Sequence, residues 1–456
     1  MVGRFPYYLY LCGKQFVCGD TAFGYGQRGG FPNNLYPDKK NCMAKKEISP
    51  ETEAFIEEHA GDNVQTLALR AARFPKVNMA TAIIQIAARQ TARTKLPTWW
   101  KTTGIRYPSH LAMEQCSSEV TARYKAALIP EELKSGSFTD LSGGFGVDFA
   151  CMAQGFDEAT YVERQEELCS LAEHNLPLLG LPHAQVVNAD STKILESLPQ
   201  QSVIFADPAR RDLKGRKTVL ISDCDPDISR LHELLMAKAR RVIVKLSPML
   251  DISLALEQLP TIREVHVVAV GGECKELLLV MEPEARSAEA RIVCANLPTS
   301  IPTVWPTPFS FTKQQEEEAD YQLATGVKAY LYEPNSVLLK AGAFRMVAAH
   351  YGVEKLHPNS HLYTSDQLIK DFPGRAFEVI THGGFGKREV KNLLESVKKA
   401  NLTVRNFPNS VADLRKRLKL AEGGDDYLFA TTLGEGEKVW ILCQKAIGET
   451  RDENND

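Results

Sequence analysis

The sequence predicts an α/β fold built on a parallel sheet, preceded by an all-α domain and followed by α+β domains. Three observations lead to this prediction. Between residues 136 and 283, short apolar runs alternate with helical segments, which is the rhythm of βαβ units. Residues 49–135 instead carry apolar residues at helical spacing. From residue 307 onward, strand patterns and helix patterns are mixed.

Composition limits the classes of protein to consider. The chain has 456 residues, of which 44% are hydrophobic, and its formal net charge is −3, so any basic patch for nucleic acid must be local. No apolar run approaches the ~20 residues that cross a membrane. The 10 cysteines are scattered without a C-x-x-C pair. This pattern predicts a cytoplasmic protein with reduced thiols and no metal site.

The N-terminal segment differs from the rest. Residues 1–45 are rich in Gly, Tyr and Phe without a clear period, and we expect a disordered or mis-assigned extension, with Met43 as the natural start. A helix signal follows in "ISPETEAFIEEH", where Ser49 can cap the helix and Pro50 suits its first turn. It opens a helical N-terminal domain that we place at residues 46–135.

Seven apolar runs predict the strands of one sheet. Helical stretches separate the first five, which should therefore be parallel. Only "GGECK" joins the last two, which fits an antiparallel hairpin. The predicted strands are residues 138–142, 159–163, 184–188, 202–206, 241–247, 265–270 and 276–282.

The region after this sheet is expected to begin with a linker and to form two small α+β domains. Residues 284–305 are interrupted by prolines, which favours a linker. Strands are predicted at "FEVITHG" and "KVWILCQK", and helices at "KREVKNLLESVKKA" and "SVADLRKRLKL". We place the two domains at residues 284–374 and 375–456, the second ending in a disordered tail.

The stretch "DLSGGFGVDF", residues 140–149, joins a strand to a helix through a glycine-rich turn. Gly144 and Gly146 remove side chains where a ligand could approach the backbone. A dinucleotide-binding G-x-G-x-x-G loop is a poor match, because its third glycine would fall at Phe149. A loop for S-adenosylmethionine requires an acid before the glycines, and Asp140 supplies it.

Three further acids follow the next strands. Glu163 can accept both hydroxyls of a ribose, and Asp190 can accept from an adenine amino group. Asp207 ends the fourth strand. Acids also favour strand ends and helix caps for structural reasons. Four of them in register with the glycine loop favour a cofactor site at the carboxyl edge of the sheet.

With these residues in place, residues 136–283 resemble a class I S-adenosylmethionine-dependent methyltransferase, with a Rossmann-like seven-stranded sheet and a terminal antiparallel hairpin. The resemblance implies that the glycine loop holds the methionine end of the cofactor, Glu163 the ribose and Asp190 the adenine. Gln115, in "EQCSSE", could lie over the cofactor or be an ordinary amide on a helix surface. The residues assigned to the cofactor are Gln115, Asp140, Ser142, Gly144, Gly146, Asp148, Glu163 and Asp190.

Residues 47–445 as a whole resemble a narrower bacterial group of methyltransferases with a DPARR motif. The stretches that carry this resemblance are "EQCSSEVTARYKA", "DLSGGFGVD", "FADPARR", "VKLSPMLD", "GGECKE" and "GGDDYLFATT". The resemblance implies that residues 284–374 are ferredoxin-like and residues 375–456 THUMP-like. Relatives of THUMP-like domains bind RNA.

The DPARR motif departs from the Asp-Pro-Pro-aromatic motif of many methyltransferases that act on exocyclic amines. Asp207 and Pro208 are kept, and Asp207 is expected to orient or deprotonate the nucleophile. Arg210 replaces the aromatic residue and could stack on a base or grip a phosphate, as could Arg211. Both arginines could equally pair with nearby acids.

The remaining substrate contacts are expected from basic residues. Lys245 could touch a substrate phosphate or be a solvated lysine, and "RKRLK" could bind a phosphate backbone through Arg415, Lys416 and Arg417 or be a solvated helix face. We therefore predict a methyltransferase acting on a base of tRNA or rRNA. Methylation of a small molecule or a protein, and a non-catalytic RNA-binding protein, are the alternatives. The sequence leaves the oligomeric state open.

Overall fold

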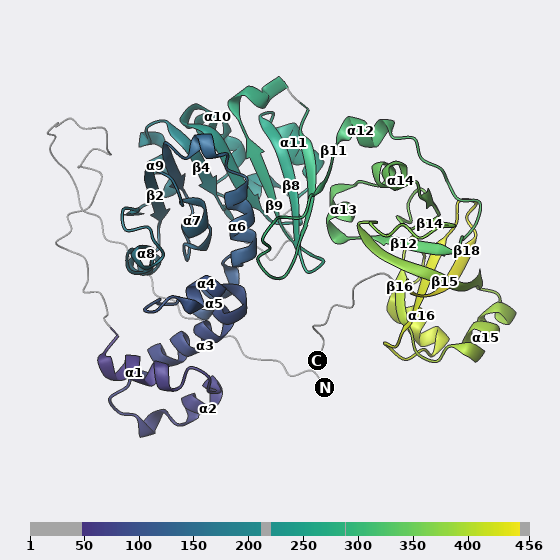
Figure 1. The fold of residues 1–456 in the computed structure, drawn as a ribbon, viewed down its shortest axis with the longest axis horizontal. Coiled ribbons are helices and arrows are strands. Elements are labelled where there is room, and N and C mark those ends of the chain that lie inside the picture. Colours follow the sequence, from purple (N-terminus) through teal and green to yellow (C-terminus); the bar gives the residue numbers. More distant parts are fainter. Residues whose placement is uncertain (1–47, 211–219, 288, 447–456) are drawn as a thin grey trace. The chain divides into compact units, whose positions relative to one another are not determined.

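The computed structural model describes residues 48–210, 220–287 and 289–446 (Figure 1). The predicted N-terminal extension, Arg211 and the predicted C-terminal tail lie outside these residues. Ser49 caps the first helix, because its hydroxyl accepts from Thr52 N at 3.3 Å, and Pro50 begins that helix, as predicted. Residues 48–136 fold into the helices α1 (Pro50–Glu58), α2 (Val64–Leu69), α3 (Met79–Lys95), α4 (Pro97–Lys101), α5 (His110–Gln115) and α6 (Glu119–Ala127).

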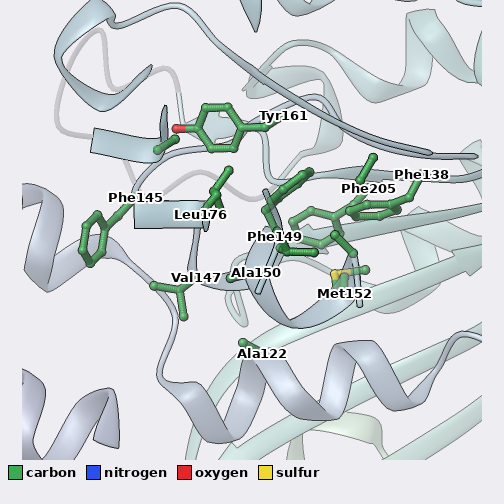
Figure 2. Packing of buried hydrophobic residues seen from close by; sticks show 14 of the residues in the cluster. Ala122, Phe138, Phe145, Val147, Phe149, Ala150, Met152, Tyr161, Leu176 and Phe205 are labelled. Atoms are coloured by element: carbon green, nitrogen blue, oxygen red, sulfur yellow. The ribbon is translucent and has the colours of Figure 1, made fainter. Parts of the chain in front are cut away.

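Helices α3 to α6 share a hydrophobic core with the sheet that follows. Leu96 and Trp99 belong to the same buried cluster as Phe138 and Phe149. Figure 2 shows Phe138 and Phe205 gathered beside Phe149 of α7 (Val147–Met152), with Ala122 of α6 on the other side of that helix. A separate small core lies between α1, α2 and the first half of α3. The later N-terminal helices therefore share the hydrophobic core of the sheet and do not form an independent one.

The main sheet has nine strands in the order β11-β10-β8-β9-β7-β4-β1-β2-β3. All seven predicted strands are present, and the predicted hairpin is antiparallel. Strand β9 lies between β7 and β8 and is antiparallel to both, whereas β7, β4, β1, β2 and β3 are parallel. The strands are β1 (Ser137–Asp140), β2 (Glu158–Glu163), β3 (Gln185–Asn188), β4 (Gln201–Ala206), β7 (Ala239–Leu246), β8 (Ile262–Val270) and β9 (Glu273–Met281).

Two unpredicted strands, β10 (Arg291–Leu297) and β11 (Phe309–Thr312), extend this sheet. The expectation of a linker at residues 284–305 is therefore wrong, because β10 pairs in parallel with β8 over its whole length. The prolines that suggested a linker follow β10 and do not interrupt it. The hairpin of β8 and β9 is consequently internal to the sheet and does not close its edge.

Both faces of the central strands are covered. Val203, Ile204 and Phe205 are successive residues of β4 and are all buried, although their side chains point alternately to opposite faces. The remaining helices of this part are α8 (Glu166–Leu178), α9 (Ser191–Ser197), α10 (Ile228–Lys238) and α11 (Ile252–Gln258). A separate two-stranded ladder joins β5 (Ala209–Arg210) to β6 (Cys224–Asp225) directly after β4.

The C-terminal region is built on a seven-stranded sheet in the order β13-β14-β12-β15-β18-β17-β16. Its strands are β12 (Tyr330–Pro334), β13 (Glu354–Lys355), β14 (Tyr363–Ser365), β15 (Gly374–Gly384), β16 (Asn401–Val404), β17 (Asp426–Thr432) and β18 (Lys438–Lys445). Its helices are α12 (Lys313–Glu318), α13 (Ser336–Ala341), α14 (Arg345–Tyr351), α15 (Lys387–Ser396) and α16 (Val411–Leu418). The predicted strands and helices of this region are present.

Candidate active site

The glycine-rich loop after β1 is held by Asp140 and Ser142. Asp140 is 1% exposed, and its Oδ1 accepts from Ser142 N at 2.8 Å and from Ser142 Oγ at 3.0 Å. Ser142 Oγ in turn accepts from Asp207 N at 2.6 Å. One serine hydroxyl therefore joins the ends of the neighbouring strands β1 and β4, where a ligand of a doubly wound sheet binds.

Three glycines let the loop turn tightly against β2. Gly144 and Gly146 have φ of 57° and 86°, which L side chains rarely adopt. Gly143 was not singled out from the sequence, yet a Cβ there would lie 2.3 Å from the ring of Tyr161. The Tyr161 hydroxyl, directed away from Phe138, Phe149 and Phe205 in Figure 2, donates to the carbonyl of Gly144. The ring of Tyr161 therefore packs directly against the loop, and only glycine fits at position 143.

Glu163 lies across the loop at the end of β2. Its Oε2 accepts from Gly144 N at 3.0 Å, and its Oε1 accepts from Gln165 N at 2.8 Å. Each carboxylate oxygen can accept a second hydrogen bond, so the pair of ribose hydroxyls fits this group. Asp190 is exposed and caps α9 by accepting from Thr192 N at 2.9 Å. It therefore has a structural role as a helix cap, and one oxygen is engaged there.

Asp207 and Lys245 come together at the ends of β4 and β7. The Lys245 Nζ donates to Asp207 Oδ2 at 2.5 Å. Pro208 is buried, and Ala209 and Arg210 continue as β5. The Arg210 side chain and Arg211 lie outside the part of the chain that the structure describes, so their predicted roles stay predictions. The ion pair of Asp207 and Lys245 joins residues 38 positions apart in the sequence.

Behind this pair lies a buried ionic network, which we call the Lys125 network: Ser117, Lys125, Asp148 and Glu276. Lys125 of α6 is 0% exposed, and its Nζ lies 2.6 Å from Glu276 Oε1 and 3.1 Å from Asp148 Oδ1. Ser117 Oγ donates to Asp148 Oδ2 at 2.7 Å. Asp148, expected beside the cofactor, thus accepts from Ser117 through Oδ2, whereas Oδ1 has the ion-pair contact with Lys125 but no hydrogen-bond partner among the described residues.

Burial and charge shift the pKa values of this site in opposite directions. Burial raises the pKa of Asp140 to about 8, against the hydrogen bonds from Ser142 and with the help of the negative charge of Asp148. Burial alone would raise the pKa of Asp148, but Lys125 and Lys245 outweigh it and hold that pKa below its usual range. Burial would likewise lower the pKa of Lys245, but Asp207, Asp148 and Glu276 raise it overall.

The raised pKa of Asp140 predicts a pH-dependent stability. Between its ordinary pKa near 3.8 in the unfolded chain and its folded pKa of about 8, the folded state binds the extra proton. The free energy of unfolding should therefore fall as the pH rises from about 5 to 8, by up to ~1.4 kcal/mol per pH unit from this group. Urea unfolding of the cofactor-free protein at several pH values measures this slope.

The Asp140→Asn variant is the control for that measurement, because the amide keeps the shape and cannot titrate. Its free energy of unfolding should depend less steeply on pH than that of the wild type over the same range. If the free energy of unfolding depended on pH equally steeply in both proteins, Asp140 would not be the source of the pH dependence.

The structure places the remaining predicted residues outside this cluster of contacts. Gln115 is exposed at the end of α5, while the next residue, Cys116, lies within the electrostatic reach of Asp148 and Lys245. Arg415 of α16 donates to the carbonyl of Ala400 at 3.4 Å, whereas Lys416 and Arg417 are exposed. The sequence-based roles of these residues in binding cofactor or substrate stay predictions.

Sequence reasoning missed Lys125, Ser117 and Glu276. All three fall within stretches that carried the family resemblance, "EQCSSEVTARYKA" and "GGECKE", but without assigned roles. A lysine between apolar residues of a helix looks like any surface lysine, because the acids that bury it come from distant elements. Nothing in the described residues groups three or more potential metal ligands, and no described helix is long and apolar enough to cross a membrane.

Comparisons with known proteins agree with this geometry. Residues 330–373 match the ferredoxin-like domain family and residues 374–445 the THUMP-like domain family. A crystal structure from Porphyromonas gingivalis W83, assigned as a methyltransferase, is 36% identical, covers 88% of this chain and 99% of its own, and superimposes with a TM-score of 0.77. An uncharacterised S-adenosylmethionine-dependent methyltransferase of Mycobacterium tuberculosis is 24% identical over 71% of this chain and 84% of its own length.

The nine-stranded sheet with its glycine loop and acidic carboxyl edge is that of a class I methyltransferase. The chain belongs to the family of S-adenosylmethionine-dependent methyltransferases in which ferredoxin-like and THUMP-like domains follow the catalytic domain. The predicted class of enzyme, the predicted fold class and the predicted cofactor, S-adenosylmethionine, are therefore confirmed. S-adenosylmethionine, when bound, supplies an activated methyl group on a sulfonium, and the glycine loop and the carboxylate of Glu163 suit its methionine end and ribose.

Proposed function

We propose that this enzyme methylates a base of structured RNA, either tRNA or rRNA. The catalytic sheet would bind the cofactor, and the ferredoxin-like and THUMP-like domains would hold the RNA. The observation that carries the proposal is the THUMP-like domain with its exposed basic helix, α16. We place the protein in the cytoplasm, because all seven described cysteines are free thiols.

The basic side chains of α16 divide into two kinds. Leu414 and Leu418 are buried and anchor the helix. Arg415 is half-buried, donates to a carbonyl and lies 3.9 Å from a Glu422 carboxylate oxygen, so it supports the domain. Lys416 and Arg417 are exposed, which leaves them open to phosphates. Exposed basic residues also begin α15: Lys387 and Arg388.

At the reaction site, Asp207 supplies the acceptor that an amine nucleophile needs. Its side chain is 36% exposed, and its Oδ1 is the oxygen not bonded to Lys245. Methyl transfer from a sulfonium requires a nucleophile held in line and freed of its proton, and a positioned carboxylate provides both. Pro208 stiffens the chain immediately after it. Arg210 and Arg211 would contact the base or its phosphate.

The test is transfer of a labelled methyl group from S-adenosylmethionine to total bacterial RNA, with a ribonuclease-treated control. The wild type should label RNA, and ribonuclease should remove the label. Label in another fraction would assign the enzyme to proteins or small molecules. Cofactor binding without transfer to any fraction would instead indicate a non-catalytic RNA-binding protein.

Charge reversal of Lys416 and Arg417 tests the RNA-binding surface. The double variant Lys416→Glu/Arg417→Glu should bind RNA more weakly, and the slope of log K against log salt should fall by about 0.7–0.9 for each phosphate that the variant no longer neutralises. The matched control is Arg73→Glu/Lys76→Glu, which reverses two exposed charges in the N-terminal helical region. Equal effects of the two double variants would contradict the proposed surface.

A further inference from the structure

Asp207 and Lys245 are placed side by side by the sheet itself. Strands β4 and β7 are parallel neighbours, and Ala206 pairs with Val244, so Asp207, which directly follows β4, comes beside Lys245, the next residue of β7. The ion pair between them measures 2.5 Å, and the Lys245 side chain is only 15% exposed. This contact therefore follows from strand register and is not a chance meeting of long surface side chains.

The ammonium of Lys245 faces carboxylates from several elements. Asp207 follows β4, Asp148 lies in the first turn of α7 and Glu276 lies on β9, and all three act on Lys245 electrostatically. On the other side of Asp148 and Glu276 lies the ammonium of Lys125, and Asp140 and the Cys116 thiol complete the titratable surroundings. A substrate phosphate approaching Lys245 would meet these acids first, and most of the ammonium is already covered.

We propose that Lys245 is a positioning residue: it fixes Oδ2 of Asp207 and neutralises its charge until substrate arrives, and it does not bind substrate phosphate. Oδ1 is then left in one orientation for the reacting group. A free carboxylate beside the loop would attract the sulfonium in the resting complex, and such binding of the ground state adds nothing to the rate. The inference rests on the proposed role of Asp207, but not on RNA being the substrate.

Cofactor analogues can measure this neutralisation without any substrate. The backbone N of Asp207 donates to Ser142 of the glycine loop, so the Asp207 carboxylate borders the loop that suits the methionine end. S-adenosylhomocysteine lacks the transferable methyl and its positive charge, whereas sinefungin carries an amine at that position. The ratio of their dissociation constants therefore reports the charge that the protein presents there.

Isothermal titration of both analogues is the experiment. Lys245→Met should bind sinefungin about five- to tenfold more tightly than the wild type, because Asp207 loses its partner, and S-adenosylhomocysteine within about twofold. Lys245→Arg should keep the wild-type ratio. Asp207→Asn alone should weaken sinefungin relative to S-adenosylhomocysteine by up to about threefold, because the Lys245 ammonium loses its partner. It should also abolish the gain in Lys245→Met, which is a non-additivity that mere loss of packing does not produce.

Lys328→Met is the matched control, since Lys328 is likewise an ion-paired lysine, 2.7 Å from Glu354 and 3.2 Å from Asp366, in the C-terminal region. It should leave both affinities unchanged. Should Lys245→Met not fold, Lys245→Gln removes the same charge. An unchanged ratio, or an equal loss of both affinities, would overturn the proposal. An unchanged ratio with a shallower salt dependence of RNA binding would assign Lys245 to substrate phosphate instead.

Discussion

Replacing Lys125 with methionine should lower the free energy of unfolding by about 3–5 kcal/mol. Methionine fills much of the volume of lysine, so the loss arises from charge and not from a cavity. It leaves Asp148 and Glu276 without the ammonium that lies 3.1 and 2.6 Å from their oxygens. Taking one partner from a buried ion pair strands the other charge in a medium that solvates it poorly. Urea unfolding measures the difference.

Lys134 provides the comparison for that experiment. Its Nζ lies 2.6 Å from Glu131 Oε1, the same separation as in the Lys125–Glu276 pair, but the Glu131 side chain is 85% exposed. Lys134→Met should therefore cost no more than about 1 kcal/mol. Adding Glu276→Gln to Lys125→Met should recover part of the lost stability. If both variants lost the same free energy of unfolding, burial of the Lys125 network would not add to its contribution to stability.

Asp207→Asn should reduce methyl transfer at least ~100-fold while the affinity for S-adenosylmethionine stays within about threefold. The amide keeps the size of the side chain but cannot take a proton, and general-base assistance is worth about 10²–10⁴ in rate. The measurement is the initial rate of transfer to RNA at saturating cofactor, together with the dissociation constant of the cofactor.

The control is Asp251→Asn, an exposed aspartate that caps α11 through Ser253 N at 2.8 Å. An asparagine cap is about as good as an aspartate cap, so the transfer rate should be unchanged. A rate for Asp207→Asn within a few fold of the wild type would remove Asp207 from the chemistry and leave it as a structural partner of Lys245.

The strands of the catalytic sheet, and three acids at its carboxyl edge, could be predicted because they depend on local patterns. Asp140, Glu163 and Asp207 each follow a short apolar run, and the glycines between Ser142 and Val147 interrupt the pattern visibly. Strand β10 was missed because the prolines on its C-terminal side suggested a linker, although "RIVCANL" is itself apolar and pairs with β8.

The partners of these acids could not be predicted, because they are set by the register of distant strands. Lys245 meets Asp207 only because β4 and β7 are neighbours in the sheet, and Lys125 meets Glu276 across 151 positions of sequence. The presence of a charged residue in the sequence does not indicate which opposite charge it will pair with in the fold. Asp148 was assigned to the cofactor from the sequence, and that role stays a prediction. Only the fold shows that it lies in the first turn of α7, where its Oδ2 accepts from Ser117 and its Oδ1 lies 3.1 Å from Lys125 Nζ.

The C-terminal sheet has a consequence for how this protein unfolds. The two domain families divide the chain between residues 373 and 374, at the first residue of β15, yet β15 pairs with β12 on one side and β18 on the other. Glu333 of β12 also binds both Arg375 and Arg405 across that division. Separation there would expose two unpaired strand edges. We therefore expect the ferredoxin-like and THUMP-like domains to unfold together, in a single thermal transition.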